Sequence, residues 1–338
     1  MACIASFTVY GFITAPDFQR CAEAAAYVNE NFPESYVVAV TQELPREFSE
    51  RRDAWAAAGQ IPLQRQQPAN TSSADSNEPS TTTSAAANES VTVLVVQHAN
   101  GSMPQQLLTA AMFLDSIGAH THYKPVPTED YYTARGQHAW RTFLASRDCQ
   151  YCWMDISIDD VPVGRILFEL FSTLTPLTCK NFCELCRGTT VLRDDIVEDS
   201  NSFDPPPAQQ VQRIGYKGTT FFRTLKDAWV MAGDVTGAHT GNGGYSCYGR
   251  CFPDEAYTVP HDAAGIIGMC NDGPHTNSSA FYITRRSMSW MNRKYVAFGR
   301  VVDGMHVVDA IHAVEVRHNQ APKAAIVITN CDVLDPTV

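Results

Sequence analysis

The sequence predicts a protein of two domains, in which an α/β domain is followed by an antiparallel β domain. Three observations lead to this prediction. The chain has 338 residues, which is enough for two hydrophobic cores of ordinary size. In its first third, short apolar runs alternate with segments of helical periodicity. After residue 152 the pattern changes to a β-hairpin in which polar and apolar residues alternate.

The first part of the chain is predicted to alternate strands and helices. Strands, rich in β-branched or apolar residues, are expected over residues 6–13, 36–40 and 91–96. Helices with an apolar face are expected over residues 16–32, 45–58 and 103–117. Residues 65–90 are rich in Ser, Thr, Asn and Ala and have no periodic apolar face, so they are predicted to form a disordered insertion.

The order of these elements resembles that of thioredoxin-like and glutaredoxin-like domains, to which we assign residues 1–118. In that family a Cys-x-x-Cys pair follows the first strand, whereas here Ala15 and Phe18 stand at the two cysteine positions. Dithiol exchange requires a thiolate, which neither residue provides. The resemblance therefore implies a domain without redox activity that serves packing or partner binding. Cys21, one turn further on, is expected to be a small buried residue.

Residues 119–150 are predicted to connect the two domains, with a helix near Thr133–Ser146. The pairs Cys149/Cys152 and Cys183/Cys186 each have the Cys-x-x-Cys spacing of half a zinc site. The interval between the pairs is longer than in common zinc ribbons, and both pairs fall inside predicted regular elements. Buried thiols are therefore the preferred interpretation and zinc is the alternative. We expect no metal and no cofactor.

Composition limits the classes of function and the location. The chain carries 25 basic and 36 acidic residues and a formal net charge of −11, which argues against binding to nucleic acid backbones. No window approaches 18 consecutive apolar residues, so we expect no transmembrane helix. The first residues lack the basic region of a secretion signal. The eleven cysteines are accordingly interpreted as reduced thiols of a cytoplasmic protein.

Specific motifs from residue 152 onward resemble the cyclophilins. They are Met154-Asp155-Ile156, Phe168-Glu169-Leu170, Gly215-Tyr216-Lys217-Gly218, Phe221-Phe222-Arg223, Gly233-Asp234, Phe252-Pro253-Asp254-Glu255, Gly273-Pro274 and Phe298-Gly299. The fold implied for residues 151–335 is a closed antiparallel eight-stranded β-barrel with two capping helices. An insertion at about 189–214, acidic first and then Pro-rich, is predicted to be a surface loop.

The resemblance also implies peptidyl-prolyl cis/trans isomerisation and its site. In a cyclophilin an arginine donates to the prolyl nitrogen and favours the deconjugated amide, across a barrier of about 18–20 kcal/mol. Arg223 matches this catalytic residue. The implied groove for a proline-containing peptide consists of Met231, Met269, Asn271, Ala280, Phe281, Tyr282, Trp290, Met291 and Tyr295. Tyr282 replaces the usual Phe, so a hydroxyl is expected at the floor of the proline pocket.

Several groove positions depart from the family pattern. Ala228 replaces a Phe, Met231 and Ala280 replace glutamines, and Tyr295 replaces a His. The lost Phe is expected to remove about 2–4 kcal/mol of apolar contact, and each lost hydrogen bond about 0.5–1.5 kcal/mol. Because about 1.4 kcal/mol is a tenfold change in rate, turnover is expected to fall by orders of magnitude. The direction of Trp229, which would decide whether it fills the space, stays open.

The combination of the two domains resembles that of a cyclophilin-family protein associated with motile cilia. It implies a ciliary or flagellar axoneme as the location and axonemal proteins, such as radial-spoke or microtubule-associated proteins, as partners besides a proline-containing peptide or protein. The sequence therefore favours a structural or docking component with weak or absent isomerase activity. The alternative is an active prolyl isomerase that assists protein folding.

Overall fold

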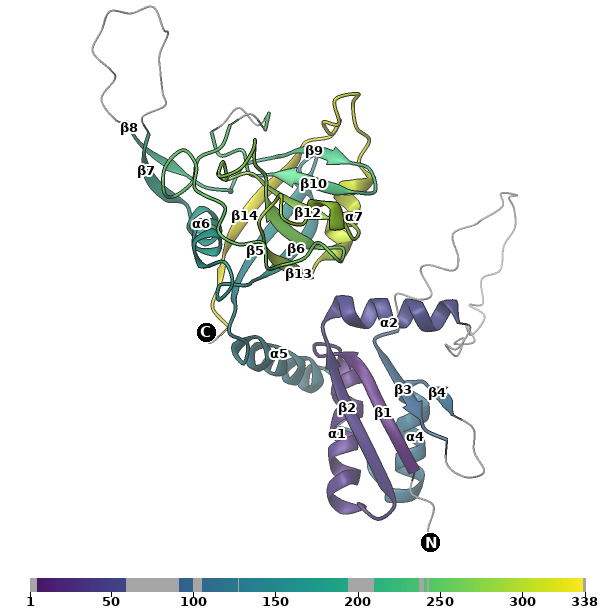
Figure 1. The fold of residues 1–338 in the computed structure, drawn as a ribbon. Helices are drawn as coiled ribbons and strands as arrows, with labels where there is room; N and C mark the ends of the chain where they lie inside the picture. Colours follow the sequence, from purple (N-terminus) through teal and green to yellow (C-terminus); the bar gives the residue numbers. More distant parts are fainter. Residues whose placement is uncertain are drawn as a thin grey trace, which may run out of the picture. The chain divides into compact units, whose positions relative to one another are not determined.

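The computed structural model describes residues 5–58, 91–99, 105–126, 128–193, 210–236, 240–241 and 243–336. The chain divides into two compact units, Met1–Leu144 and Ala145–Val338, each with its own hydrophobic core (Figure 1). The insertion that the sequence predicts to be disordered, residues 65–90, lies outside the described residues.

The first unit is built on a four-stranded mixed sheet. Its strands are β1 (Ala5–Phe12), β2 (Tyr36–Glu43), β3 (Val93–Gln97) and β4 (Gln106–Leu108), in the order β2-β1-β3-β4. β1 runs parallel to β2 and antiparallel to β3, and β4 is antiparallel to β3. Alternate residues of β1, among them Phe7 and Val9, are buried in the core, as the period of a strand requires.

Four helices of this unit are described: α1 (Pro16–Asn31), α2 (Pro45–Ala57), α4 (Ala110–Thr121) and α5 (Glu129–Ala145). The helix expected over residues 103–117 is wrong at its beginning, because Gln106–Leu108 pairs with β3 as a strand. α4 begins only after Thr109, whose hydroxyl accepts a hydrogen bond from the Met112 N–H at 3.2 Å. A threonine that satisfies a free N–H in this way marks a helix N-terminus.

The segment expected to be a connector contributes a helix that packs onto the first unit. α5 buries Tyr132 completely, and its Arg135 donates to the side-chain oxygen of Gln19 at 3.3 Å. Gly136 lies against the backbone of Thr14 so closely that a Cβ would stand 2.8 Å from the carbonyl oxygen. α5 therefore adjoins the beginning of α1, where Ala15 is only 1% exposed. The position expected for the first redox cysteine is thus both thiol-free and covered.

The second unit is a nearly closed antiparallel barrel of eight strands, in the order β14-β5-β6-β13-β11-β12-β10-β9 (Figure 1). Their bounds are β5 Gln150–Ile158, β6 Val161–Leu170, β9 Phe221–Leu225, β10 Trp229–Ala232, β11 Ile266–Met269, β12 Phe281–Thr284, β13 Ala297–Asp303 and β14 Ile326–Leu334. A bridge between Thr220 and Val327 joins the two end strands. The Gly218 N–H donates to the Ile328 carbonyl at 2.8 Å beside it. The expected barrel is present, and a few bonds instead of a full ladder close it.

Two helices, α6 (Pro176–Arg187) and α7 (Met305–Ala313), pack on the barrel, and a short 3-10 turn, η1, covers Ser289–Met291. Phe182 of α6 lies against Phe168, Phe281 and Phe298 in the core, with ring centroids 5.2–5.8 Å apart. Such aromatic contacts add to the stability that burial alone provides.

The insertion at 189–214 is not wholly a loop. Its ends form β7 (Thr189–Arg193) and β8 (Gln210–Ile214), which pair as an antiparallel ladder, so the prediction of a plain surface loop is wrong there. The acidic and Pro-rich residues between them lie outside the described residues. Val191 and Ile214 are buried against the barrel core, which explains why these two short runs take strand pairing.

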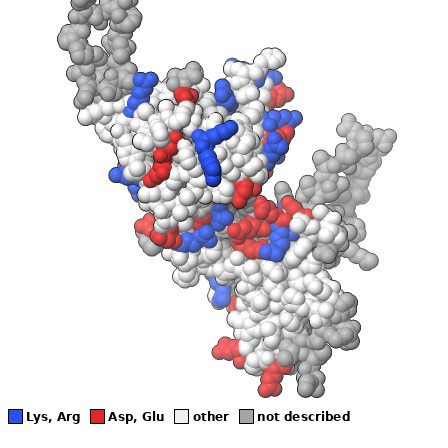
Figure 2. Space-filling model, in the orientation of Figure 1, with Lys and Arg blue, Asp and Glu red and all other residues white. Residues whose placement is uncertain are grey.

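Two further observations concern the charged side chains on the surface and the length of the helices. Acidic and basic side chains are interspersed over the described face of the second unit in the view of Figure 2. Among the helices of the described residues, none is both long and apolar enough to span a bilayer.

Candidate functional site

A pocket of about 760 Å³ opens on the second unit, between β9, β10 and β12 and the loops beside them. All but two of the residues expected from the sequence line it: Arg223, Met231, Asn271, Ala280, Tyr282, Trp290, Met291 and Tyr295. The exceptions are Met269 and Phe281, which are 0% exposed and belong to the barrel core. The reason is the strand period: Tyr282 faces the pocket, so its neighbour Phe281 faces the interior.

Arg223 is an exposed residue of β9 that stands directly opposite Met231 of β10. Side chains of directly opposed residues lie on the same face, with Cβ atoms about 5 Å apart. A thioether is only a weak hydrogen-bond acceptor, and Ala280 in the same pocket offers no polar atom. The Arg223 guanidinium has no hydrogen bond or ion pair to any of the residues that the structure describes. The cation is present, but within the described part of the chain no side chain holds it in one position.

One end of the pocket is an aromatic wall. The Trp290 ring lies 5.9 Å from that of Trp229 and 6.5 Å from that of Tyr295, centroid to centroid. Trp229 lines the pocket and packs against the small hydrophobic cluster that contains the buried Ala228 and Met291. This settles the direction of Trp229, which the sequence leaves open. The apolar character of the proline pocket is kept although its residues have changed.

The floor of the pocket contains three hydrogen-bonded side chains that the sequence does not reveal. The Tyr282 hydroxyl lies 2.5 Å from Nε2 of His261, whose Nδ1 lies 2.9 Å from the side-chain oxygen of Asn292. His261 is fully buried, and burial lowers its pKa although the hydrogen bond to Asn292 acts in the opposite direction. The extra hydroxyl expected at the floor is therefore engaged by His261. No motif in the sequence links these three residues.

The other end of the pocket is polar and is organised by a buried carboxylate. Asp234 accepts the backbone N–H groups of Thr240, Gly241 and Gly243 at 3.1, 2.9 and 3.3 Å. Burial raises the pKa of Asp234, but hydrogen bonds from Thr236 and from these backbone groups outweigh burial and leave the pKa below its ordinary value. The residues that line this end are Thr240, Gly241, Gly243, Gly244, Arg250, Cys251, Thr276 and Ser278.

The two Cys-x-x-Cys pairs lie away from the pocket. Cys152, Cys183 and Cys186 are in the barrel core, with the sulfurs of Cys152 and Cys183 3.6 Å apart. Over the described residues, no group of three or more His, Cys, Asp or Glu side chains is arranged to hold a metal ion. These thiols are packed as small apolar side chains.

Comparisons with known proteins agree with this geometry. The model of the cyclophilin type peptidyl-prolyl cis-trans isomerase/CLD family matches residues 153–333. The chain is 37% identical over 187 residues, 55% of each chain, to the probable inactive peptidyl-prolyl cis-trans isomerase-like 6 of Bos taurus. It is 35% identical over 178 residues to the Homo sapiens protein of that name, covering 53% of this chain and 52% of the relative.

A further relative is the peptidyl-prolyl cis-trans isomerase CYP22 of Arabidopsis thaliana, 38% identical over 180 residues, which are 53% of this chain and 81% of the relative. The chain thus spans about half the length of the two isomerase-like 6 proteins that it matches. The family match covers just over half of its 338 residues and coincides with the barrel and its pocket. The chain therefore belongs to the cyclophilin family of peptidyl-prolyl cis-trans isomerases.

Proposed function

We propose that this divergent cyclophilin binds proline-containing segments and acts mainly as a docking component, with weak or absent isomerase activity. One observation carries the proposal: the pocket keeps Arg223 and an apolar proline site, but Met231 and Ala280 occupy the positions from which glutamines would hold the arginine. Binding needs the apolar site and one donor. Turnover needs that donor fixed against the prolyl nitrogen.

The size of the loss follows from the hydrogen bonds that are missing. A hydrogen bond to a charged group contributes about 1.5–3 kcal/mol, so two such bonds amount to roughly 3–6 kcal/mol. If this difference is expressed mostly in the transition state, the rate falls roughly a hundredfold to ten-thousandfold. Peptide affinity depends on burial of the proline ring and should fall much less. Uncoupling of binding from catalysis is the expected signature.

Isomerisation by this pocket is the second candidate function, and the retained Arg223 beside an aromatic wall favours it. A peptide exchange assay compares the full chain with its Arg223→Ala variant. The docking proposal predicts a low rate in both, with peptide binding weakened in the variant. A high rate that disappears in the variant would establish an active isomerase and overturn the proposal.

Within this proposal the first unit is a thioredoxin-like domain without redox function. Its strand order β2-β1-β3-β4, with only the β1–β2 pair parallel, supports that assignment. We further propose a cytoplasmic protein of the ciliary or flagellar axoneme, with axonemal partners such as radial-spoke or microtubule-associated proteins. The support is the resemblance of the two-domain combination.

Location is tested by detergent extraction of isolated cilia or flagella. The proposal predicts that the protein stays with the axoneme in detergent and leaves only under conditions that dissolve axonemal substructures. Recovery of the protein wholly in the detergent-soluble fraction, as a monomer, would contradict the axonemal role and leave the pocket chemistry untouched.

A further inference from the structure

The polar end of the pocket carries a second cation. Arg250 and Arg223 both line the pocket, together with one acid, Asp272. The buried carboxylate of Asp234 lies behind this end, so two arginines and two acids balance and the pocket is close to neutral on a chain whose formal net charge is −11. Arg250 is exposed, and its guanidinium has no hydrogen bond or ion pair among the residues that the structure describes. The two arginines of this pocket, neither paired with a residue in the described ranges, provide donors that a ligand can use.

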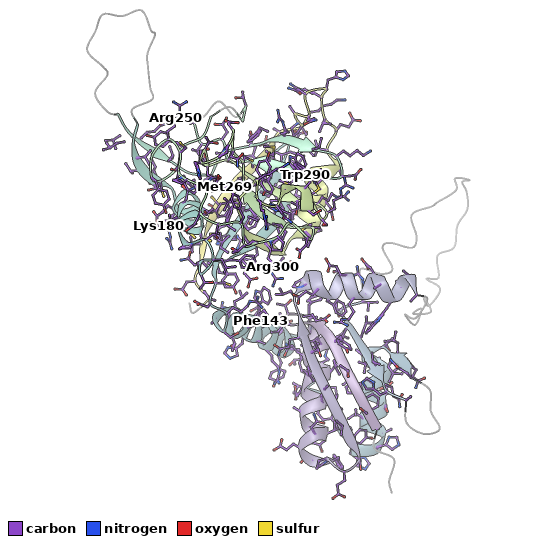
Figure 3. All side chains as sticks on the ribbon, viewed as in Figure 1. Phe143, Lys180, Arg250, Met269, Trp290 and Arg300 are labelled. Atoms are coloured by element: carbon purple, nitrogen blue, oxygen red, sulfur yellow. The ribbon has the colours of Figure 1, made fainter. Side chains whose placement is uncertain are left out.

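Arg250 lies at a distance from the aromatic wall. Figure 3 shows Arg250 and Trp290 well apart on the barrel, on either side of the buried Met269. The aromatic end is joined by ring contacts such as that between Trp229 and Trp290. The polar end is built separately on the segment that Asp234 holds. A segment whose proline ring fills the aromatic end can therefore reach Arg250 only with a residue that is not the proline itself.

We propose that the pocket selects proline-containing segments that carry an anionic side chain near the proline, and that Arg250 binds this anion. The inference rests on the proposed peptide-binding function and names its substrate class. A guanidinium offers paired donors that match a carboxylate or a phosphate, and such charge-assisted bonds are the stronger ones. The hydroxyl of Ser278 lines the same end and can donate to an oxyanion, whereas the hydroxyl of Thr276 already donates to the Gly273 carbonyl at 2.7 Å. A cationic segment would instead meet two arginines.

The test measures peptide affinity with the full chain. Fluorescent peptides contain one proline and one variable residue, Glu, phosphoserine, Gln or Lys, placed one to three positions before or after the proline. At one position the Glu or phosphoserine peptide is expected to bind about fivefold tighter than the Gln peptide, or about 1 kcal/mol. The Lys peptide is expected to bind more weakly, and added salt should reduce the differences. The Glu and phosphoserine arms show whether the natural anion is a carboxylate or a phosphate.

The decisive variant is Arg250→Gln, with Arg286→Gln as its control. Arg286 is exposed and does not line the pocket. The preference for the anionic peptide is expected to vanish in Arg250→Gln and to persist in Arg286→Gln, and Arg286→Gln should leave the affinity for the Gln peptide unchanged. Equal affinity for Glu and Gln peptides at every position, or a preference that survives Arg250→Gln, would overturn the inference. If no proline peptide binds at all, the proposed function fails instead.

Cys251 provides an independent measure of where the peptide lies. It is exposed, follows Arg250 in the chain and lines the pocket. Bound anionic peptide is expected to slow alkylation of Cys251 by iodoacetamide at least threefold, as read by mass spectrometry of the digested protein. Unchanged alkylation of Cys251 at a peptide concentration that saturates binding would place the peptide elsewhere and contradict the assignment.

Discussion

If loss of side chains that hold Arg223 has silenced this cyclophilin, returning them should restore activity. The perturbation is the double variant Met231→Gln and Ala280→Gln. Met231 is the direct cross-strand partner of Arg223, so a glutamine there stands on the same face with its Cβ about 5 Å from that of the arginine. A glutamine side chain spans that gap and can accept from the guanidinium.

The expected gain follows from the same hydrogen bonds. One bond to a charged group contributes about 1.5–3 kcal/mol, so a single restored glutamine is expected to raise the rate at least about tenfold and both together at least about a hundredfold. The pocket holds about 760 Å³, and Met231 and glutamine are similar in length, so the first change should fit without displacing the aromatic wall.

The assay is NMR exchange between the cis and trans forms of a short alanyl-proline peptide, with kcat/KM taken for the full chain and each variant. Adding Arg223→Ala to the double variant should remove the gain. Met112→Gln is the matched control, because Met112 is an exposed methionine of the first unit. A folded double variant that binds the peptide and isomerises it no faster than the unaltered chain would refute the reasoning.

Three further predictions concern the support of the barrel and pocket. Burial, aided by the charge of Arg285, lowers the pKa of His312 to about 4. Below pH 6.5 the unfolded chain therefore takes up a proton that folded His312 does not, so stability should fall from pH 6.5 to about 4. Chemical denaturation at each pH should show that the unfolding free energy of His312→Leu depends less on pH over this range. An unchanged pH dependence would contradict this. Glu169 is 1% exposed and pairs with Arg300 at 2.8 Å. Glu169→Ala should cost about 3 kcal/mol of unfolding free energy, and a loss below about 1 kcal/mol would argue against it. Finally, a Cβ at Gly268 would stand 2.1 Å from the hydroxyl oxygen of the Tyr282 side chain, which forms the floor of the pocket. Gly268→Ala should therefore abolish peptide binding in an anisotropy assay. Normal peptide affinity of this variant would count against a rigid pocket floor.

Much of the second unit follows from local sequence. Alternating residues and tight turns specify a β-hairpin, and short motifs such as Phe221-Phe222-Arg223 resemble those of cyclophilins, so both the barrel and most pocket residues can be located from the chain alone. The length of a strand and the residue at which a helix begins depend on tertiary pairing. Gln106–Leu108 accordingly has an apolar helical pattern but pairs with β3.

The pocket details that the sequence misses are long-range contacts. His261 meets the Tyr282 hydroxyl across 21 positions of the chain, and neither residue type at that spacing signals a hydrogen bond. Whether Phe281 or Tyr282 faces the pocket depends on strand register, which a resemblance gives only approximately. The same holds for Trp229, which packs against a cluster whose members, Ala228, Tyr282, Met288 and Met291, come from separate parts of the chain.

The most direct test of uncoupled binding and catalysis observes both in one sample. An isotope-labelled alanyl-proline peptide is titrated with the full, unaltered chain, and NMR records the shifts of bound peptide and the cis/trans exchange rate together. The account predicts saturable shifts that weaken in Arg223→Ala, with exchange at least tenfold slower than the Met231→Gln, Ala280→Gln variant produces. Exchange as fast as in that variant, at the same fraction of bound peptide, would contradict it.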